Sequence, residues 1–228
     1  MKATLLGLLA LLVALPVSAQ EVGYPPAQSP YTDLLYKQEL SPFGGWASAS
    51  DDAARVLPKS ASIAGVRYQV YLGGPVSFDA DFSRMGSTRN VIDPKQVAAK
   101  RLLGTTAAAV YGVNVGVALS LTGRKSWHHL VPEVRGGAGV VSSEAKDDSS
   151  GYTFGTPFAF TFGGGLKFVS LGRLQIRADV GERLYKQKYP DSFYQNASDN
   201  TSVLTTQARS FWANQTLFTV GASLLFDR

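Results

Sequence analysis

The two histidines of the chain, His128 and His129, are adjacent, and imidazole is a common metal ligand and proton carrier near neutral pH. Adjacent side chains of a strand point in opposite directions, and no cysteine or clustered carboxylate flanks this pair. A polar turn beside Trp127 explains the two histidines better than a ligand set or a general base. We therefore predict no metal site and no catalytic residue at this position.

Two carboxylates, Asp79 and Asp81, are the next candidates for chemistry, because a pair on one face of a strand can share acid–base work. Arg67 lies in the preceding segment, and a tight turn at Gly73-Gly74 would fold the two segments against each other. This arrangement favours a structural ion-pair network over catalysis, and we predict that Arg67 pairs with Asp79 or Asp81. Gly163-Gly164-Gly165 lacks the Lys-Ser/Thr pair of a phosphate-binding loop, so we expect no nucleotide cofactor.

The elements that must position these residues are strands, because apolar side chains recur with period two from residue 62 onward. In residues 76–85, for example, Phe78 and Phe82 share one face while Asp79 and Asp81 share the other. Alternation of this kind predicts strands at 62–72, 76–85, 105–121, 130–142, 158–169, 174–185 and 212–226. A less regular segment at 40–49, blurred by Pro42 and glycines, is expected to supply the eighth strand.

The connections between these strands alternate in length. Those at Gly73-Gly74, 122–129 and 170–173 are short, whereas those at 50–61, 86–104, 143–157 and 186–211 are long and polar. Consecutive antiparallel strands alternate in direction, so all short turns fall at one end and all long loops at the other. Short periplasmic turns, long extracellular loops and strands of about ten residues are typical of transmembrane β-barrels.

The N-terminal residues predict export. Residues 1–19 combine Lys2, an apolar run too short to span a bilayer as a helix, and the cleavage pattern Val17-Ser18-Ala19, which together indicate a signal peptide. Residues 20–39 are interpreted as a periplasmic extension with a short helical turn at 31–37, and residues 40–228 as the barrel domain. The net charge of +5 is spread without long runs, which does not indicate a nucleic-acid partner.

The apolar face of the strands is expected to contact lipid, and the polar face to fill a narrow lumen. Glycines such as Gly112, Gly116, Gly163 and Gly165 recur on the polar face, where a water-exposed surface would favour larger polar residues. Charges confined in a lumen must be paired to avoid a large desolvation cost. We predict a lumen charge network of Arg67, Asp79, Asp81, Glu133, Arg135, Lys167, Arg177, Asp179 and Arg183 that plugs the barrel.

The final strand carries a spaced pattern of Thr219, Gly221, Leu224 and Phe226, although Asp227 and Arg228 follow the aromatic residue. It resembles the C-terminal assembly signal of bacterial outer-membrane barrels. With the eight strands, residues 40–226 resemble the OmpA/OmpX-like group of small outer-membrane barrels, and residues 126–132 and 151–156 are similar to stretches in barrels of environmental Gram-negative bacteria. The resemblance implies this fold, the outer membrane and docking on its assembly machinery, and it brings no assigned activity.

We therefore predict an all-β, eight-stranded antiparallel transmembrane barrel in the outer membrane, non-enzymatic and monomeric, that contacts lipid and has a structural or surface-interaction role. The surface partner is not specified by the sequence. One alternative is a barrel that transports or binds a small solute or lipid ligand. A second is a soluble periplasmic lipocalin-like binder, suggested by the short match at Gly44 and Trp46.

Overall fold

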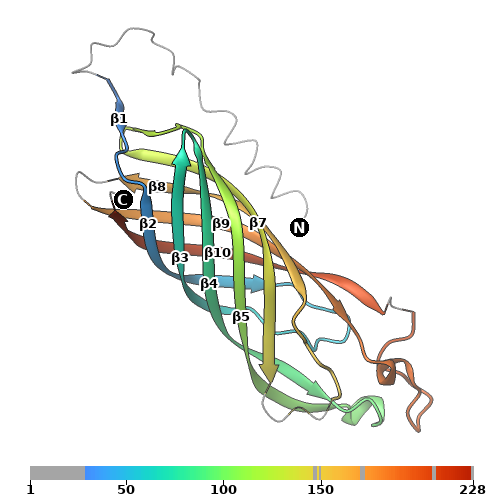
Figure 1. The fold of residues 1–228 in the computed structure, drawn as a ribbon. Helices are drawn as coiled ribbons and strands as arrows, with labels where there is room; N and C mark the ends of the chain where they lie inside the picture. The colour runs from blue at the N-terminus through green and yellow to red at the C-terminus, as the bar shows by residue number, and fades with distance from the viewer. Residues whose placement is uncertain (1–28, 146–147, 149, 170–172, 207–208, 227–228) are drawn as a thin grey trace. The chain divides into compact units, whose positions relative to one another are not determined.

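The computed structural model describes residues 29–145, 148, 150–169, 173–206 and 209–226. The unit that spans Tyr31–Arg228 is a β-barrel (Figure 1). The predicted signal peptide and residues 20–28 of the predicted extension lie outside the described residues, so both stay predictions. Within the ranges given above, no helix is long and apolar enough to cross a membrane.

Eight antiparallel strands form a closed ring in which each strand pairs with its neighbours along the chain and β10 pairs with β2. They are β2 (Gln38–Ala49), β3 (Ala61–Gly73), β4 (Val76–Ile92), β5 (Leu102–Ser120), β7 (Leu130–Ala145), β8 (Phe158–Val169), β9 (Leu174–Lys188) and β10 (Ser210–Phe226). Closure pairs the backbone donors and acceptors of every strand edge, which a sheet in lipid requires. The predicted eight-stranded antiparallel barrel is confirmed.

Two short strands lie beside this ring at the end that carries the short turns. β1 (Tyr31–Asp33) pairs with β6 (Lys125–Trp127), which lies in the turn between β5 and β7. The predicted helical turn at 31–37 is therefore wrong, because the backbone of β1 bonds to a neighbouring strand instead of to itself. At the opposite end, the loops carry two short 3-10 helices, η2 (Ala98–Lys100) and η3 (Asp191–Tyr194).

The strands extend further toward the long loops than the alternation of apolar residues indicates. β4 and β5 remain paired up to Ile92 and Leu102, so the predicted loop 86–104 shrinks to residues 93–101. Small and polar residues such as Gly86 and Thr88 keep the backbone ladder there, although they carry no apolar signal. At the other end β2 begins at Gln38, two residues earlier than predicted, because Phe226 pairs with Gln38.

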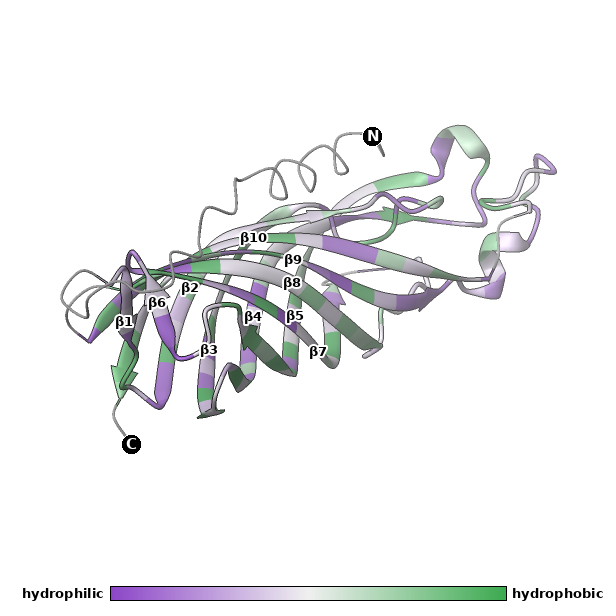
Figure 2. Ribbon diagram, turned by 90° about the horizontal axis from the view of Figure 1, so that it is seen from above, coloured by the Kyte–Doolittle hydropathy of each residue, from purple (hydrophilic) through white to green (hydrophobic). Residues whose placement is uncertain are grey.

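The outer face of the barrel is apolar along the middle of the strands. Large side chains such as Phe78, Val115, Phe160 and Val220 are exposed there, and Figure 2 shows hydrophobic segments alternating with hydrophilic ones along each strand. Exposed aromatic residues lie at or near strand ends, among them Trp127, Phe158, Trp212 and Phe226, whereas Tyr68 and Tyr111 lie near the middle of β3 and β5. This exterior suits lipid, with rings at the interfaces.

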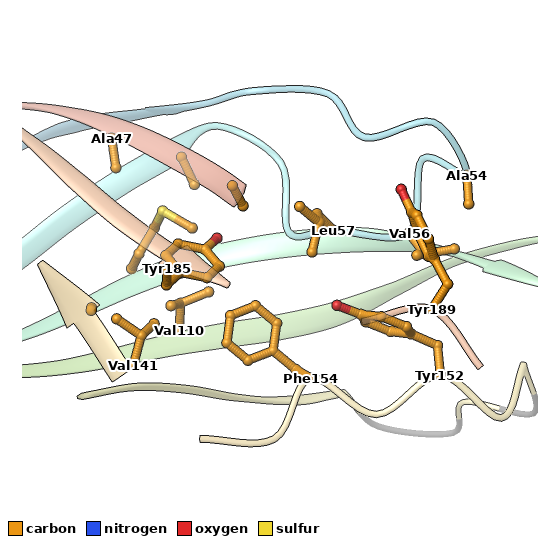
Figure 3. Close-up of a cluster of buried hydrophobic side chains, with 14 of the residues drawn as sticks. Ala47, Ala54, Val56, Leu57, Val110, Val141, Tyr152, Phe154, Tyr185 and Tyr189 are labelled. Atoms are coloured by element: carbon orange, nitrogen blue, oxygen red, sulfur yellow. The ribbon is translucent and has the colours of Figure 1, made fainter. Parts of the chain in front are cut away.

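The interior is filled in three layers. At the end of the short turns, the turn-end plug consists of Leu34, Tyr36, Val131, Val169 and Leu225. The middle holds charged side chains. At the other end, residues of the long loops and of the inner strand faces pack into a loop-end cap, drawn in Figure 3, that includes Met85, Val110, Phe154, Tyr185 and Tyr189. The predicted lumen of polar residues and charges therefore describes only the middle layer.

Candidate functional site

The middle layer is a charge belt of eight inward-facing side chains. Four are basic and four are acidic, so the belt is electrically balanced: Arg67, Arg135, Lys167 and Arg177 against Glu39, Asp79, Glu133 and Asp179. They come from β2, β3, β4, β7, β8 and β9, at positions where the period-two alternation turns the side chain inward. Seven of the eight belong to the predicted network, and Glu39 is the addition.

Glycines of the inner face make room for the long charged side chains. A Cβ atom at Gly165 would collide with the carboxylate of Asp179, and one at Gly112 would lie 2.9 Å from the guanidinium of Arg183. Substitution at either position would therefore force a charged side chain out of place. This packing explains why glycine recurs on the polar face of the strands.

Glu39 is at the centre of the first half of the belt and is completely buried. Its Oε2 lies 2.8 Å from Nζ of Lys167, and its Oε1 lies 2.9 Å from Nη1 of Arg177. The hydroxyls of Tyr71, Ser41 and Ser223 each donate to the same carboxylate at 2.8 Å. Every oxygen of this carboxylate is thus satisfied in a site from which water is excluded.

Lys167 joins Glu39 to a second carboxylate. Its Nζ lies 2.7 Å from Oε1 of Glu133 and donates to Oε1 of Gln69 at 3.1 Å and to the hydroxyl of Tyr71 at 2.6 Å. The ammonium group is buried and fully surrounded by polar partners. A buried ammonium persists in the charged form only with such compensation.

Asp179 is at the centre of the second half of the belt. Its carboxylate accepts from Nη1 of Arg67 at 3.1 Å, from Nη2 of Arg135 at 2.8 Å and from Nε of Arg177 at 3.0 Å. Arg67 also lies 3.8 Å from Asp79 through Nε, and its Cα is opposite that of Asp81. Arg67 therefore forms an ion pair with Asp79 on the adjacent strand and a shorter one across the lumen with Asp179 on β9.

The last two predicted network residues, Asp81 and Arg183, lie on the loop side of the belt. Asp81 accepts from Nδ2 of Asn114 at 3.0 Å, and Arg183 donates to Oγ of Ser83 at 2.9 Å. They line a cavity of about 60 Å³ together with belt residues such as Asp79 and with apolar side chains such as Phe43 and Leu217. Its volume suits a few water molecules, for which the charged side chains are partners, and it is far too small for an organic solute.

Glu39 is the one belt residue outside the predicted network, and the hydroxyl of Tyr71 that contacts it is not predicted either. The predicted boundary places residue 39 in the periplasmic extension, outside the lumen. The signal was present, since Glu39 and Ser41 alternate with Leu40 and Pro42 in the same way as the other strands. Extending the alternation backward by one residue places Glu39 inside the barrel.

The histidines lie in the turn that leads into β7. His128 and His129 both have positive φ, at 47° and 66°, and Nδ1 of His129 lies 3.1 Å from the carbonyl oxygen of Val169. The ring of His128 packs against that of Trp127, with centroids 4.8 Å apart. Both residues therefore shape the turn. Over the part of the chain that the structure describes, no group of three or more His, Cys, Asp or Glu side chains is arranged to hold a metal ion.

The four residues of the predicted assembly signal lie on β10, the strand that closes the ring against β2. Thr219 and Gly221 face inward, and a Cβ at Gly221 would lie 2.6 Å from the carbonyl oxygen of Pro42. Leu224 and Phe226 are exposed on the outer face. Their place at the closing seam is a structural fact, and their role in assembly stays a prediction.

No protein-family model matches the chain, and no curated protein matches its sequence. Solved structures do match. Neisserial surface protein A is 11% identical with a TM-score of 0.52, over 83% of this chain and 97% of that one. The outer membrane protein OprG from Pseudomonas aeruginosa is 12% identical with a TM-score of 0.51, over 86% and 99% of the two chains.

At such low sequence identity the similarity supports an inference about the fold alone. Both matched proteins are barrels covered over nearly their whole length, so the agreement extends to the complete ring of strands. The exposed apolar band supplies the independent physical argument for lipid around that ring. The chain therefore has the fold of the small eight-stranded outer-membrane β-barrel proteins.

Proposed function

We propose that the protein is a closed, non-enzymatic outer-membrane barrel with a structural or surface-interaction role. The observation that supports the proposal is that buried side chains fill the lumen in three layers, the turn-end plug, the charge belt and the loop-end cap. An eight-stranded barrel has an interior that side chains just fill. We infer that no solute passes through such an interior and that the long loops are the part left for interaction.

The charge belt opposes passage more strongly than apolar packing alone would. A solute or ion that crosses the lumen must separate charges that contact each other at 2.7–3.1 Å, such as Lys167 with Glu133 and Arg67 with Asp179. Leaving one buried charge of such a pair without its partner costs about 3–5 kcal/mol. We infer that the belt is a permanent plug.

The turn-end plug closes the barrel from the side that we assign to the periplasm. Leu34 and Tyr36 precede β2, and Nη2 of Arg124 donates to the carbonyl oxygens of both residues at 2.6 Å and 2.5 Å. The guanidinium of Arg124 also lies 5.0 Å from the ring centroid of Tyr71. These contacts fasten the segment before β2 across the barrel mouth.

The loops that form the loop-end cap are held together by specific contacts. The buried carboxylate of Asp52 accepts from the backbone N–H of Leu57 at 2.9 Å and from the hydroxyl of Tyr189 at 2.9 Å. The hydroxyl of Tyr152 donates to Gln187 at 3.1 Å, and Arg89 forms an ion pair with Asp148. We assign this ordered end to the cell surface, where it presents the long loops to partners outside the cell.

Assembly and lipid contact complete the proposal. We infer that the assembly machinery docks on β10 through Thr219, Gly221, Leu224 and Phe226, and that the barrel is a monomer surrounded by outer-membrane lipid. The soluble lipocalin-like alternative is disfavoured by the exposed apolar exterior. Fractionation tests it directly, because a membrane barrel stays with the outer-membrane fraction after a high-salt wash whereas a soluble binder is released.

Planar-bilayer recording tests the closed lumen. Wild-type protein should give no reproducible conductance steps, and Arg177→Ala, which removes contacts to both halves of the belt, should give steps. Purified wild type should also lack hydrolase activity on ester substrates. Steady steps from the wild-type protein would contradict closure and support the small-solute transport alternative. Absence of steps from a folded Arg177→Ala variant would show that the belt is not what closes the barrel.

A further inference from the structure

A carboxylate lies on the outer face of the barrel wall near the loop end. Glu182 lies between Val180 and Leu184 on the outward face of β9, where its charge interrupts an apolar series. Oγ1 of Thr216, opposite on β10, donates to its Oε1 at 2.6 Å. Its Oε2 is covered and has no hydrogen-bond partner among the described residues. Ionisable groups at lipid-facing depth are costly and mark functional sites, so this oxygen calls for a donor from outside the chain.

Two lysines lie above Glu182 on the same outward face. Lys186 and Lys188 follow at steps of four and six residues toward the loops, and both are exposed. Neither forms an ion pair with any residue that the structure describes. Two ammonium groups about 7 Å apart along one strand face form a binding position for phosphate at the membrane surface.

Aromatic rings flank this position. Trp212 is the Cα partner of Lys186 on β10, and its ring centroid is 6.4 Å from that of Phe160 on β8. Phe158 continues the group, with its centroid 5.0 Å from that of Phe160. All three rings are about half exposed. They form an apolar surface for acyl chains directly beside the two lysines and the carboxylate.

We propose that this outer face of β8, β9 and β10 is a binding site for a phosphorylated glycolipid with amide-linked or hydroxylated acyl chains, which is the chemistry of lipid A. Lys186 and Lys188 bind the phosphate. Glu182, which is only partly buried, turns to accept a hydrogen bond from an amide N–H or a hydroxyl beneath that phosphate. The three aromatic rings, which lie at the level of Lys186 and just below it, pack against the start of the chains. The inference rests on the proposed function, because it requires the loop end to lie in the outer leaflet.

The order of groups distinguishes this occupant from an ordinary glycerophospholipid. From the loops inward the site presents the two lysines with Trp212 beside Lys186, then Phe160 beside Leu184, and then the hydrogen-bond-accepting carboxylate of Glu182. Beneath its phosphate a glycerophospholipid carries ester carbonyls, which accept hydrogen bonds and cannot donate one to Glu182. An amide-linked or hydroxylated chain supplies a donor at that depth. The site should therefore select for the donor-bearing glycolipid and not for negative charge alone.

The test is native mass spectrometry of the full-length purified protein titrated in detergent with two probes, diphosphorylated lipid A and phosphatidylglycerol. Wild type should retain lipid A about tenfold more tightly than phosphatidylglycerol. The double variant Lys186→Glu/Lys188→Glu should lose lipid A affinity by about tenfold or more, because both phosphate contacts become repulsive. The matched control Lys95→Glu/Lys100→Glu makes the same charge change at two exposed loop lysines and should stay within about twofold of wild type.

A third variant tests the carboxylate separately. Glu182→Leu should weaken lipid A binding while leaving phosphatidylglycerol binding equal or stronger, so the selectivity between the two probes should vanish. The heat-dependent shift of the folded barrel on a gel establishes that each variant is folded. Equal wild-type affinity for both probes, an unaffected lysine variant, or unchanged selectivity in Glu182→Leu would each overturn the inference. Release of the protein from membranes by high salt would instead refute the proposed function on which it rests.

Discussion

Removing the charge of Glu39 is the sharpest perturbation of the charge belt. Glu39→Gln keeps the size of the side chain but leaves Lys167 and Arg177, at 2.8 Å and 2.9 Å, with one carboxylate fewer in a fully buried site. The belt then carries one uncompensated positive charge. Breaking a buried ion pair by removing one partner costs about 3–5 kcal/mol, so we expect a loss of that size in the free energy of unfolding.

The assay is reversible urea unfolding of the refolded barrel in detergent micelles, monitored by tryptophan fluorescence. The control is Lys95→Gln, an exposed loop change that should shift stability by less than about 0.5 kcal/mol. The double variant Glu39→Gln/Lys167→Met restores the balance of charge and should recover part of the loss. A Glu39→Gln effect no larger than that of the loop control would refute the reasoning that the belt excludes water and depends on paired charge.

Four further outcomes follow from the same geometry. Protease treatment of intact cells should cleave within the long loops and not within the β5–β7 turn at 122–129, since only the loop end is assigned to the cell surface. A double-mutant cycle of Arg67 with Asp179 should give a larger coupling energy than one with Asp81, because the 3.1 Å contact is to Asp179. Additive effects of the Arg67 and Asp179 substitutions would contradict the pairing across the lumen. Phe226→Ala should slow insertion in cells, measured by pulse-chase, more than it lowers the stability of the folded barrel, measured by urea unfolding. Normal insertion of this variant would contradict the predicted assembly signal. Burial, reinforced by the Asp52 carboxylate, raises the pKa of Tyr189 above its ordinary value of 10.0. The stability that the protonated hydroxyl contributes is therefore complete below pH 10 and is lost as the pH rises through the folded-state pKa. Protease cleavage of the long loops should increase at alkaline pH, and the increase should be smaller in Tyr189→Phe.

The sequence predicts the inside and outside of the barrel well because strand alternation is a local property. Phe78 and Asp79 point to opposite faces of β4 whatever the rest of the chain does. The lengths of the connections are local as well, and they determine which strand ends gather together. Seven of the eight belt residues could therefore be assigned to the lumen from period two alone, while Glu39 was missed only through the boundary placed after it.

Only the tertiary structure decides which charges meet. Arg67 and Asp179 are 112 residues apart, and their contact exists because closure of the ring brings β3 and β9 across a lumen that long side chains can span. The loop-end cap is likewise invisible to alternation, since inward apolar residues such as Met85 and Val110 have a partner only after distant loops fold over them. The backbone geometry of each strand decides whether a side chain points into the lumen or toward lipid. Pairing across the lumen depends on the register and closure of all eight strands, which no single segment encodes.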